Sequence, residues 1–256
     1  MPELILETKG LTRRFGGLTA VDSVDIEMKA GELVGLIGPN GAGKSTFFNC
    51  LTGFYSPSEG EVRFMDRPIT GLKPYEVAKL GIGRTFQNLR IMPNLTVFDN
   101  VSIGAIGSLG HSLRRAIWPF RCETDKKISE RTWDILSRVG LDSLAGELAA
   151  NLSYGKRKYL EIARAMATNP KLLILDEPAA GLNEQETTQL AGFIRELNSD
   201  GLPILLVEHD MGLVMGICHR VVVLALGKKI ADDTPEAIQK NPAVLEAYLG
   251  GEQCQY

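Results

Sequence analysis

Long apolar runs are absent from this chain of 256 residues. Its longest apolar stretches, 202–207 and 221–226, have the length of strands and fall far short of the roughly 18–20 residues that cross a bilayer. The opening sequence Met-Pro-Glu-Leu lacks a basic region followed by an apolar segment, so we expect no signal peptide. These absences predict a chain without membrane-spanning helices of its own.

A net positive charge and closely spaced cysteine pairs are also missing. The formal net charge is -3 at pH 7, which argues against nucleic acid as the main partner because that role demands a basic face. The cysteines lie far apart without metal-type pairing, so we expect scattered buried thiols and a reducing cytoplasm. They are Cys50, Cys122, Cys218 and Cys254. Hydrophobic residues make up 44% of the chain and charged residues 23%, as in an ordinary globular protein.

Two kinds of strand pattern occur along the chain. Apolar residues alternate with charged ones in 24–28 and again in 62–64, which predicts an antiparallel sheet covered on one face. By contrast, 33–37, 172–175 and 204–207 are almost continuously apolar. Such runs are typical of parallel strands buried on both faces, each followed by a loop that carries polar residues.

Helical spacing dominates from about residue 74 to residue 151. We interpret 74–151 as a helical subdomain inserted into an α/β core made of 1–73 and 152–256. A Gly-, Ser- and Arg-containing insertion lies at 104–124. A C-terminal extension, 228–256, contains Thr-Pro at 234–235 and Asn-Pro at 241–242, each typical of a helix N-cap followed by proline.

Residues 38–45, Gly-Pro-Asn-Gly-Ala-Gly-Lys-Ser, match the phosphate-loop pattern G-x-x-x-x-G-K-[ST] between a predicted strand and a predicted helix. Its glycines let backbone N–H groups wrap around phosphates, and the helix N-terminus adds positive potential. Lys44 would reach the β- and γ-phosphates, and the Ser45 hydroxyl would ligate Mg²⁺. The candidate nucleotide-binding residues are Gly38, Pro39, Asn40, Gly41, Ala42, Gly43, Lys44, Ser45 and Thr46.

Two carboxylates, Asp176 and Glu177, follow the apolar run 172–175. Asp176 can hold Mg²⁺, directly or through water. Glu177 can polarise the attacking water as general base, a role commonly worth about 10²–10⁴ in rate. The alternative is that Asp-Glu-Pro merely opens a turn, but the phosphate loop upstream favours the catalytic reading. The two motifs together predict a nucleotide-hydrolysing fold without indicating what it powers.

Residues 151–156, Asn-Leu-Ser-Tyr-Gly-Lys, lie about twenty residues before Asp176 and precede a helical run. They resemble the L-S-G-G-Q signature of the ABC transporter ATPases, from which they depart at Tyr154 and Lys156. In this family two copies meet head to tail, and each ATP lies between the phosphate loop of one and the signature of the other. The resemblance implies that Ser153 and Gly155 donate to the partner's γ-phosphate; it leaves the roles of Tyr154 and Lys156 open.

Further matches to the same family follow in the family's order. Gln87 resembles the glutamine that senses Mg²⁺ and the γ-phosphate, and His209 resembles the histidine that contacts the γ-phosphate. Phe15 stands where the family stacks an aromatic ring on adenine, although it could equally cap the antiparallel sheet. Asn183 stands where the family usually has aspartate, and with Glu186 it could instead cap a helix.

The resemblance covers essentially the whole chain and implies an α/β fold. It implies a P-loop ATPase core with a mainly parallel sheet, an N-terminal antiparallel β-subdomain and an inserted helical subdomain. ATP and Mg²⁺ would be the cofactors. The catalytic residues would be Glu177, His209 and Gln87, and the metal would be held by Ser45, Gln87 and Asp176.

Within the family, the chain is most similar to the ATPase subunits of branched-chain (hydrophobic) amino-acid importers. The similarity is carried by the insertion after Gly104 and by 83–88, 178–183, 207–211, 213–217, 234–238 and 241–250. The resemblance implies a second ATPase subunit, identical or not, two membrane permeases and an external binding protein that touches the substrate. It places the chain in the cytoplasm, on the inner face of the plasma membrane. The alternatives are an ATPase for lipopolysaccharide export and a soluble ABC protein of DNA repair or translation.

The segment 88–95 offers apolar side chains around a proline directly after Gln87. They are Leu89, Ile91, Met92 and Leu95. In the family, the cleft beside this loop receives a short cytoplasmic helix of the permease. Alternatively, these side chains only pack the helical subdomain.

Overall fold

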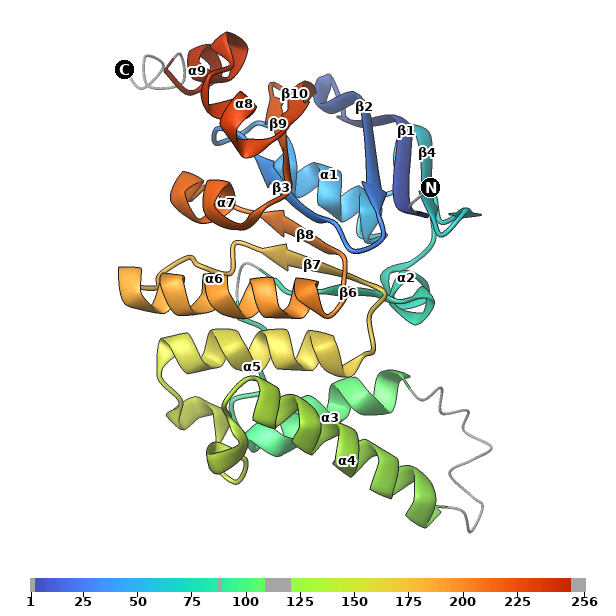
Figure 1. Ribbon diagram of the computed structural model, residues 1–256. Helices are drawn as coiled ribbons and strands as arrows, with labels where there is room; N and C mark the ends of the chain where they lie inside the picture. Colours follow the sequence, from blue (N-terminus) through green and yellow to red (C-terminus); the bar gives the residue numbers. More distant parts are fainter. Residues whose placement is uncertain (1–2, 87–88, 109–120, 250–256) are drawn as a thin grey trace.

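The computed structural model describes residues 3–86, 89–108 and 121–249 (Figure 1). Gln87, Asn88, the middle of the 104–124 insertion and Cys254 lie outside the described residues, as does the side chain of Cys122.

The N-terminal part forms a four-stranded antiparallel sheet in the order β2-β1-β4-β5. Its strands are β1 (Leu4–Phe15), β2 (Leu18–Lys29), β4 (Glu59–Phe64) and β5 (Arg67–Pro68). In β2, Val24, Ile26 and Met28 are buried, and the residues between them are exposed. The predicted antiparallel sheet with one covered face is confirmed.

A second, six-stranded sheet has the order β10-β9-β3-β8-β7-β6. Its strands are β3 (Leu33–Ile37), β6 (Ile82–Arg84), β7 (Leu172–Asp176), β8 (Ile204–Val207), β9 (Arg220–Ala225) and β10 (Lys228–Asp233). All neighbours pair in parallel except β10, which is antiparallel to β9. The apolar runs predicted as doubly buried strands are β3, β7 and β8, and every residue in them is buried.

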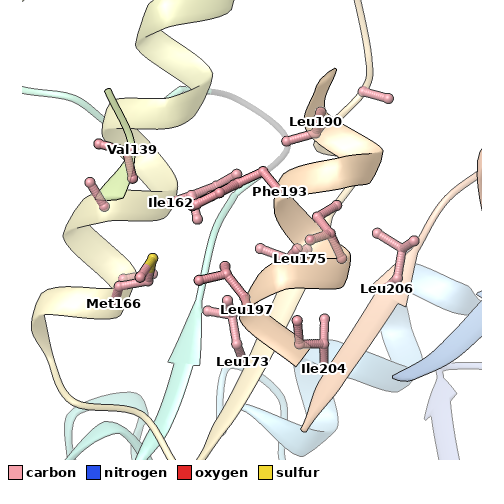
Figure 2. Close-up of a cluster of buried hydrophobic side chains, with 14 of the residues drawn as sticks. Val139, Ile162, Met166, Leu173, Leu175, Leu190, Phe193, Leu197, Ile204 and Leu206 are labelled. Carbon is pink, nitrogen blue, oxygen red and sulfur yellow. The ribbon is translucent and has the colours of Figure 1, made fainter. Parts of the chain in front are cut away.

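The six-stranded sheet separates two apolar layers. One layer contains α1 (Lys44–Leu51) and the inner face of the antiparallel sheet. The other contains α5 (Tyr154–Ala167), α6 (Glu184–Ser199) and α7 (Met211–Ile217). Figure 2 shows the second layer, with Leu173 and Leu175 of β7 facing Phe193 and Leu197 of α6. These strands alternate their side chains between the two layers, and both layers are apolar, which explains their unbroken hydrophobic sequences.

The helical part contains α2 (Pro74–Leu80), α3 (Val97–Ser108) and α4 (Arg121–Arg138), and α3 and α4 pack against α5 (Figure 1). Two short turns of 3₁₀ helix, Asp142–Leu144 and Ala149–Asn151, lead into α5. Strand β6 also lies within 74–151 and pairs with β7, so this range is not wholly helical. Three residues are too few to show strand alternation in the sequence. The subdomain bounds themselves stay a prediction.

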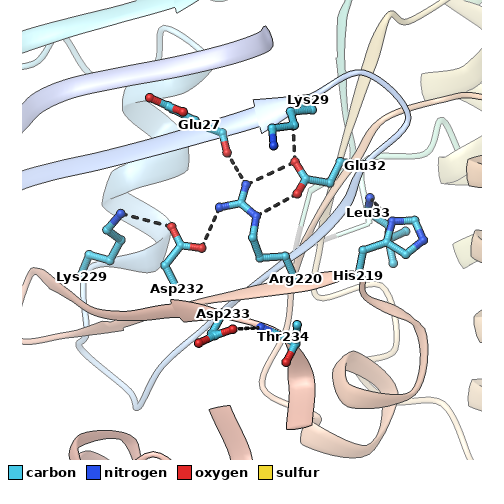
Figure 3. A network of polar contacts seen from close by, with 10 residues as sticks. All are labelled: Glu27, Lys29, Glu32, Leu33, His219, Arg220, Lys229, Asp232, Asp233 and Thr234. Carbon is cyan, nitrogen blue, oxygen red and sulfur yellow. Dashed lines mark hydrogen bonds and ion pairs between the residues drawn. The ribbon is translucent and has the colours of Figure 1, made fainter. Parts of the chain in front are cut away.

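Arg220, the first residue of β9, joins the two sheets (Figure 3). Its guanidinium donates to Glu32 at 2.8 Å, to Asp232 of β10 at 2.7 Å and to the carbonyl of Glu27 in β2. Several charge-assisted hydrogen bonds on one half-buried guanidinium hold its partners in a fixed geometry. Asp232 belongs to β10, so the extension 228–256 begins as a strand of the six-stranded sheet.

The two helices of the extension begin at the predicted caps. Thr234 precedes α8 (Pro235–Gln239), and its Oγ1 accepts from the Ala237 N–H at 3.4 Å. Asn241 precedes α9 (Pro242–Leu249) and accepts from the Ala243 N–H at 3.0 Å. Both predicted helix starts are confirmed.

Among the described residues, no helix combines the length and the apolarity needed to cross a membrane. Cys50 and Cys218 are buried free thiols, as predicted, and burial raises the pKa of Cys50 to about 11 and that of Cys218 to about 12.

Candidate functional site

The loop from Gly38 to Gly43 joins β3 to α1. A Cβ on Gly38 (φ 151°) would lie 2.1 Å from the Leu224 carbonyl oxygen, and one on Gly43 (φ 99°) would lie 2.3 Å from the Ala20 carbonyl oxygen. Both positions therefore need glycine for backbone conformation and for space. The neighbouring backbone fixes the loop's shape.

The end of the loop is open to an anion. Helix α1 begins at Lys44 after Gly43, and among the described residues no side chain caps this end; its first turn holds no acidic residue. The first N–H groups of a helix have no partners within it and carry positive potential. Together with the loop's backbone, they can cradle a phosphate.

Lys44 is a buried cation, only 8% exposed, held within the loop. Its Nζ donates to the carbonyls of Gly38 at 2.6 Å and Pro39 at 3.2 Å. Burial lowers the pKa of Lys44, and the charge of Glu177 opposes that shift. A phosphate at this place would supply the negative charge that two neutral carbonyls do not.

Asp176 ends β7 and is buried. Its backbone N–H donates to Thr85 Oγ1 at 3.0 Å, and its Oδ2 lies 3.7 Å from Nη2 of Arg84. Glu177 follows with a positive φ of 47°, which is rare for a residue with a side chain. Its N–H donates to the carbonyl of Val207 at 2.9 Å. The structure thus holds Glu177 in a strained backbone conformation of the kind that clusters at functional sites.

His209 lies beside Glu177, the other residue expected to act in catalysis, and the catalytic roles of both stay a prediction. Its Nδ1 is 3.9 Å from Glu177 Oε2 and 3.8 Å from Glu208 Oε2, and its side chain is largely exposed. Glu208 is fully buried, which raises its pKa, and its carboxylate accepts from the N–H groups of Ala179 and His209. Glu208 therefore ties the loop after Glu177 to the backbone of His209.

Sequence reasoning missed Arg84, the neighbour of Asp176. Three phenylalanine rings surround its guanidinium, with centroids at 4.4–4.8 Å: Phe48, Phe54 and Phe86. It also donates to Asn49 Oδ1 at 2.8 Å, and burial lowers its pKa to about 10. Only Phe86 is a near neighbour of Arg84 in the sequence; Phe48, Phe54 and Asp176 are at least 30 residues away, so no local pattern could have found this environment.

Phe15 lies at the end of β1 with an exposed ring. The ring meets Tyr55 edge-on, with centroids 5.3 Å apart, and the Arg13 guanidinium lies 4.5 Å from its centroid. Sequence reasoning singled out neither Tyr55 nor Arg13. Stacking of Phe15 on adenine stays a prediction.

The signature residues lie on the other side of the six-stranded sheet from Lys44. Ser153 caps α5, its Oγ accepting from the Lys156 N–H at 3.5 Å, and α5 belongs to the layer opposite α1. A Cβ on Gly155 would lie 2.7 Å from Glu186 Oε1. The structure therefore does not gather Ser153 and Gly155 with the phosphate loop inside one chain.

Asn183 caps α6. It accepts from the Glu186 N–H at 2.9 Å and donates its own N–H to Glu186 Oε2 at 3.0 Å, a complete capping box. The capping alternative for Asn183 is confirmed.

Comparison with known proteins gives matches over nearly the whole chain. The family model described as ABC transporter matches residues 21–180, and the model described as branched-chain amino acid ATP-binding cassette transporter matches residues 228–253. The high-affinity branched-chain amino acid transport ATP-binding protein LivG of Escherichia coli strain K12 is 45% identical, over 98% of this chain and 99% of that protein. BraF of Pseudomonas aeruginosa, named for the same role, is 44% identical over the same shares.

Solved structures agree. The crystal structure of an ABC transporter ATP-binding cassette in its ADP conformation has a TM-score of 0.86 and 33% identity, over 96% of this chain and 99% of that chain. A dimeric, post-hydrolysis ATP-binding cassette bound to ADP and Pi has a TM-score of 0.76 and 26% identity, over 90% of this chain and 99% of that chain.

Proposed function

The chain belongs to the ABC transporter ATP-binding cassette family, and from that premise we propose that its ATPase activity drives uptake of branched-chain amino acids through separate permeases. The observation that carries the proposal is the pairing of a rigid phosphate loop with Asp176 and Glu177 in a fold of this family. The match of 228–253 to the branched-chain model and the full-length likeness to LivG and BraF support the substrate class.

The residues of the site fit a nucleotide with Mg²⁺. The buried Lys44 ammonium and the open N-terminus of α1 suit phosphates, and the Ser45 hydroxyl and the Asp176 carboxylate are hard oxygen donors of the kind that Mg²⁺ prefers. Gln87, our third proposed metal residue, lies outside the described residues. Bound there, Mg²⁺ would supply positive charge to the β- and γ-phosphate oxygens.

Each of these side chains of the chain then has its own role in ATP hydrolysis. Lys44 holds the terminal phosphates, and Glu177 takes the proton of the attacking water. His209, whose ring lies within 4 Å of the Glu177 carboxylate, orients the γ-phosphate or the water beside that carboxylate. Arg84 keeps Asp176 at the end of β7 in place.

We infer that the working ATPase is a dimer, because Ser153 and Gly155 lie across the main sheet from Lys44 in one chain. A second copy or a related ATPase, placed head to tail, would bring its Ser153 to the ATP held by Lys44. The likeness to a dimeric cassette bound to ADP and Pi supports this arrangement.

Mixing two inactive variants tests the dimer. Chains with Ser153→Arg and chains with Lys44→Ala should each hydrolyse ATP poorly alone, and activity should return in part on mixing, because one site of a mixed dimer keeps both intact halves. ATPase rates are measured alongside cross-linking that proves mixed dimers form. Mixed dimers without recovered activity would contradict the arrangement in trans.

The permeases would dock at the cleft between the α/β core and the helical part. A cavity of about 360 Å³ lies there, lined by residues that include Phe54, Tyr75, Phe86 and Ile103. Ile91 packs against the core, but Met92 is 38% exposed, with its backbone fixed by Asn100. Ile91 therefore serves internal packing, whereas Met92 is available to a partner. Docking would hold the chain on the cytoplasmic face of the membrane.

Reconstitution with the permeases and the binding protein tests both substrate and docking. The complex should take up labelled leucine in an ATP-dependent way, and Met92→Asp should reduce uptake per ATP at least several-fold while the subunit stays folded, because Met92 is exposed. Leu245→Asp, at an exposed apolar residue of α9 (49% exposed), is the control. Normal coupling in the Met92 variant would place docking elsewhere, and no leucine uptake by the intact complex would refute the substrate.

A further inference from the structure

Tyr154 and Lys158 lie four residues apart on the first two turns of α5, on the same face of the helix. Tyr154 stands where the signature has glycine, and neither residue has a part in the function proposed above. Both side chains reach the loop that follows β7, at residues 177–183, where Glu177 lies.

Tyr154 makes two contacts with this loop. Its hydroxyl donates to the carbonyl of Ala180 at 3.1 Å. Its ring covers Gly181, where a Cβ would lie 2.9 Å from a ring carbon and where φ is +80°. Because Gly181 has no side chain, the ring of Tyr154 packs directly against its backbone without a clash.

Lys158 reaches the backbone of Glu177 itself. Its Nζ donates to the Glu177 carbonyl at 3.2 Å, and the residue is only 2% exposed. A buried ammonium is costly without acceptors, so this carbonyl is an important partner for the charge. The Glu177 N–H bonds to Val207 and its carbonyl accepts from Lys158, so the strained backbone at φ 47° is held on both sides.

We propose that Tyr154 and Lys158 are positioning residues that clamp the start of α5 to the loop carrying Glu177. This inference rests on the proposed function, in which Ser153, beside Tyr154, contacts the ATP of the partner, whereas Glu177 acts on the ATP of its own chain. The Tyr154–Lys158 clamp then connects the two ATP sites of the dimer through one chain: a shift of α5 on contact with one ATP moves the base that serves the other.

Hydrogen exchange of the free chain tests the clamp without any nucleotide. Tyr154→Phe should raise exchange of the amides of Ala180 and Leu182 roughly 3- to 10-fold, because a neutral hydrogen bond to the loop is lost. Tyr159→Phe is the matched control, since it removes a hydroxyl from the same helix, from a ring that packs on Phe193 of α6. Unchanged exchange in the Tyr154 variant would overturn the clamp.

ATPase kinetics test the coupling. Tyr154→Phe should lower kcat roughly 3- to 10-fold, and Lys158→Met should lower it roughly 10- to 100-fold. In both variants KM should be unchanged and cooperativity in ATP should weaken, because Glu177 is misplaced while nucleotide binding is intact. Should Lys158→Met fail to fold, the milder Tyr154 variant decides. Faster loop exchange with normal kcat and cooperativity would overturn the coupling. An intact chain that hydrolyses no ATP would instead refute the proposed function, and the exchange result would still decide whether the clamp exists.

Discussion

Lys44→Ala is expected to weaken ATP binding by at least about 100-fold, because the phosphates lose charge-assisted hydrogen bonds from the loop's buried cation. Backbone N–H groups of the loop and α1 would remain, so residual binding at millimolar nucleotide is compatible with this expectation. Calorimetric titration with ATP and Mg²⁺ gives the dissociation constant.

The control for this variant is Lys126→Ala, which removes a lysine that lies largely exposed on α4. A circular dichroism melt shows whether removing the contacts of Lys44 to Gly38 and Pro39 disturbs the fold. Equal affinity in a folded Lys44→Ala chain would mean that 38–45 does not hold the phosphates.

Glu177→Gln should lower kcat by about 10²–10⁴ while ATP binding persists. The amide keeps the shape of the carboxylate and the backbone contacts to Val207 and Lys158, but it cannot accept the proton of water. ATP should then trap the chain as a dimer, seen as an earlier peak in gel filtration with ATP and Mg²⁺.

Glu236→Gln, an exposed position on α8, serves as the control for the same chemical change. Normal turnover in Glu177→Gln would mean that another group activates the water, and His209, 3.9 Å from the Glu177 carboxylate, would be the first to examine.

The parts of the site that sequence could predict are those written in continuous segments. The phosphate loop between a strand and a helix, the two carboxylates at the end of β7 and the helix caps at Thr234 and Asn241 each depend on neighbours a few residues away. The structure places them on the expected elements. Period-two alternation likewise predicted the antiparallel sheet.

What sequence could not predict depends on distant partners. The surroundings of Arg84 include Phe48 of α1 and Asp176 of β7, both far from it in sequence, and the partner of Lys158 is the carbonyl of Glu177. In the sequence, Tyr154 was only a departure from the signature. The space for its ring comes from Gly181 in another loop, which the sequence could not show. Strand β6 was missed since three residues carry no periodicity and only pairing with β7 defines them.

Strand β10 has a consequence beyond the site. It covers the open side of β9, whose residues Val221, Val222 and Val223 are fully buried. In a chain ending before Lys228, β9 would become an edge with unpaired backbone groups and an apolar surface, which is a template for aggregation, and Arg220 would lose Asp232. The C-terminal extension therefore protects the solubility of the ATPase whatever it contributes to transport.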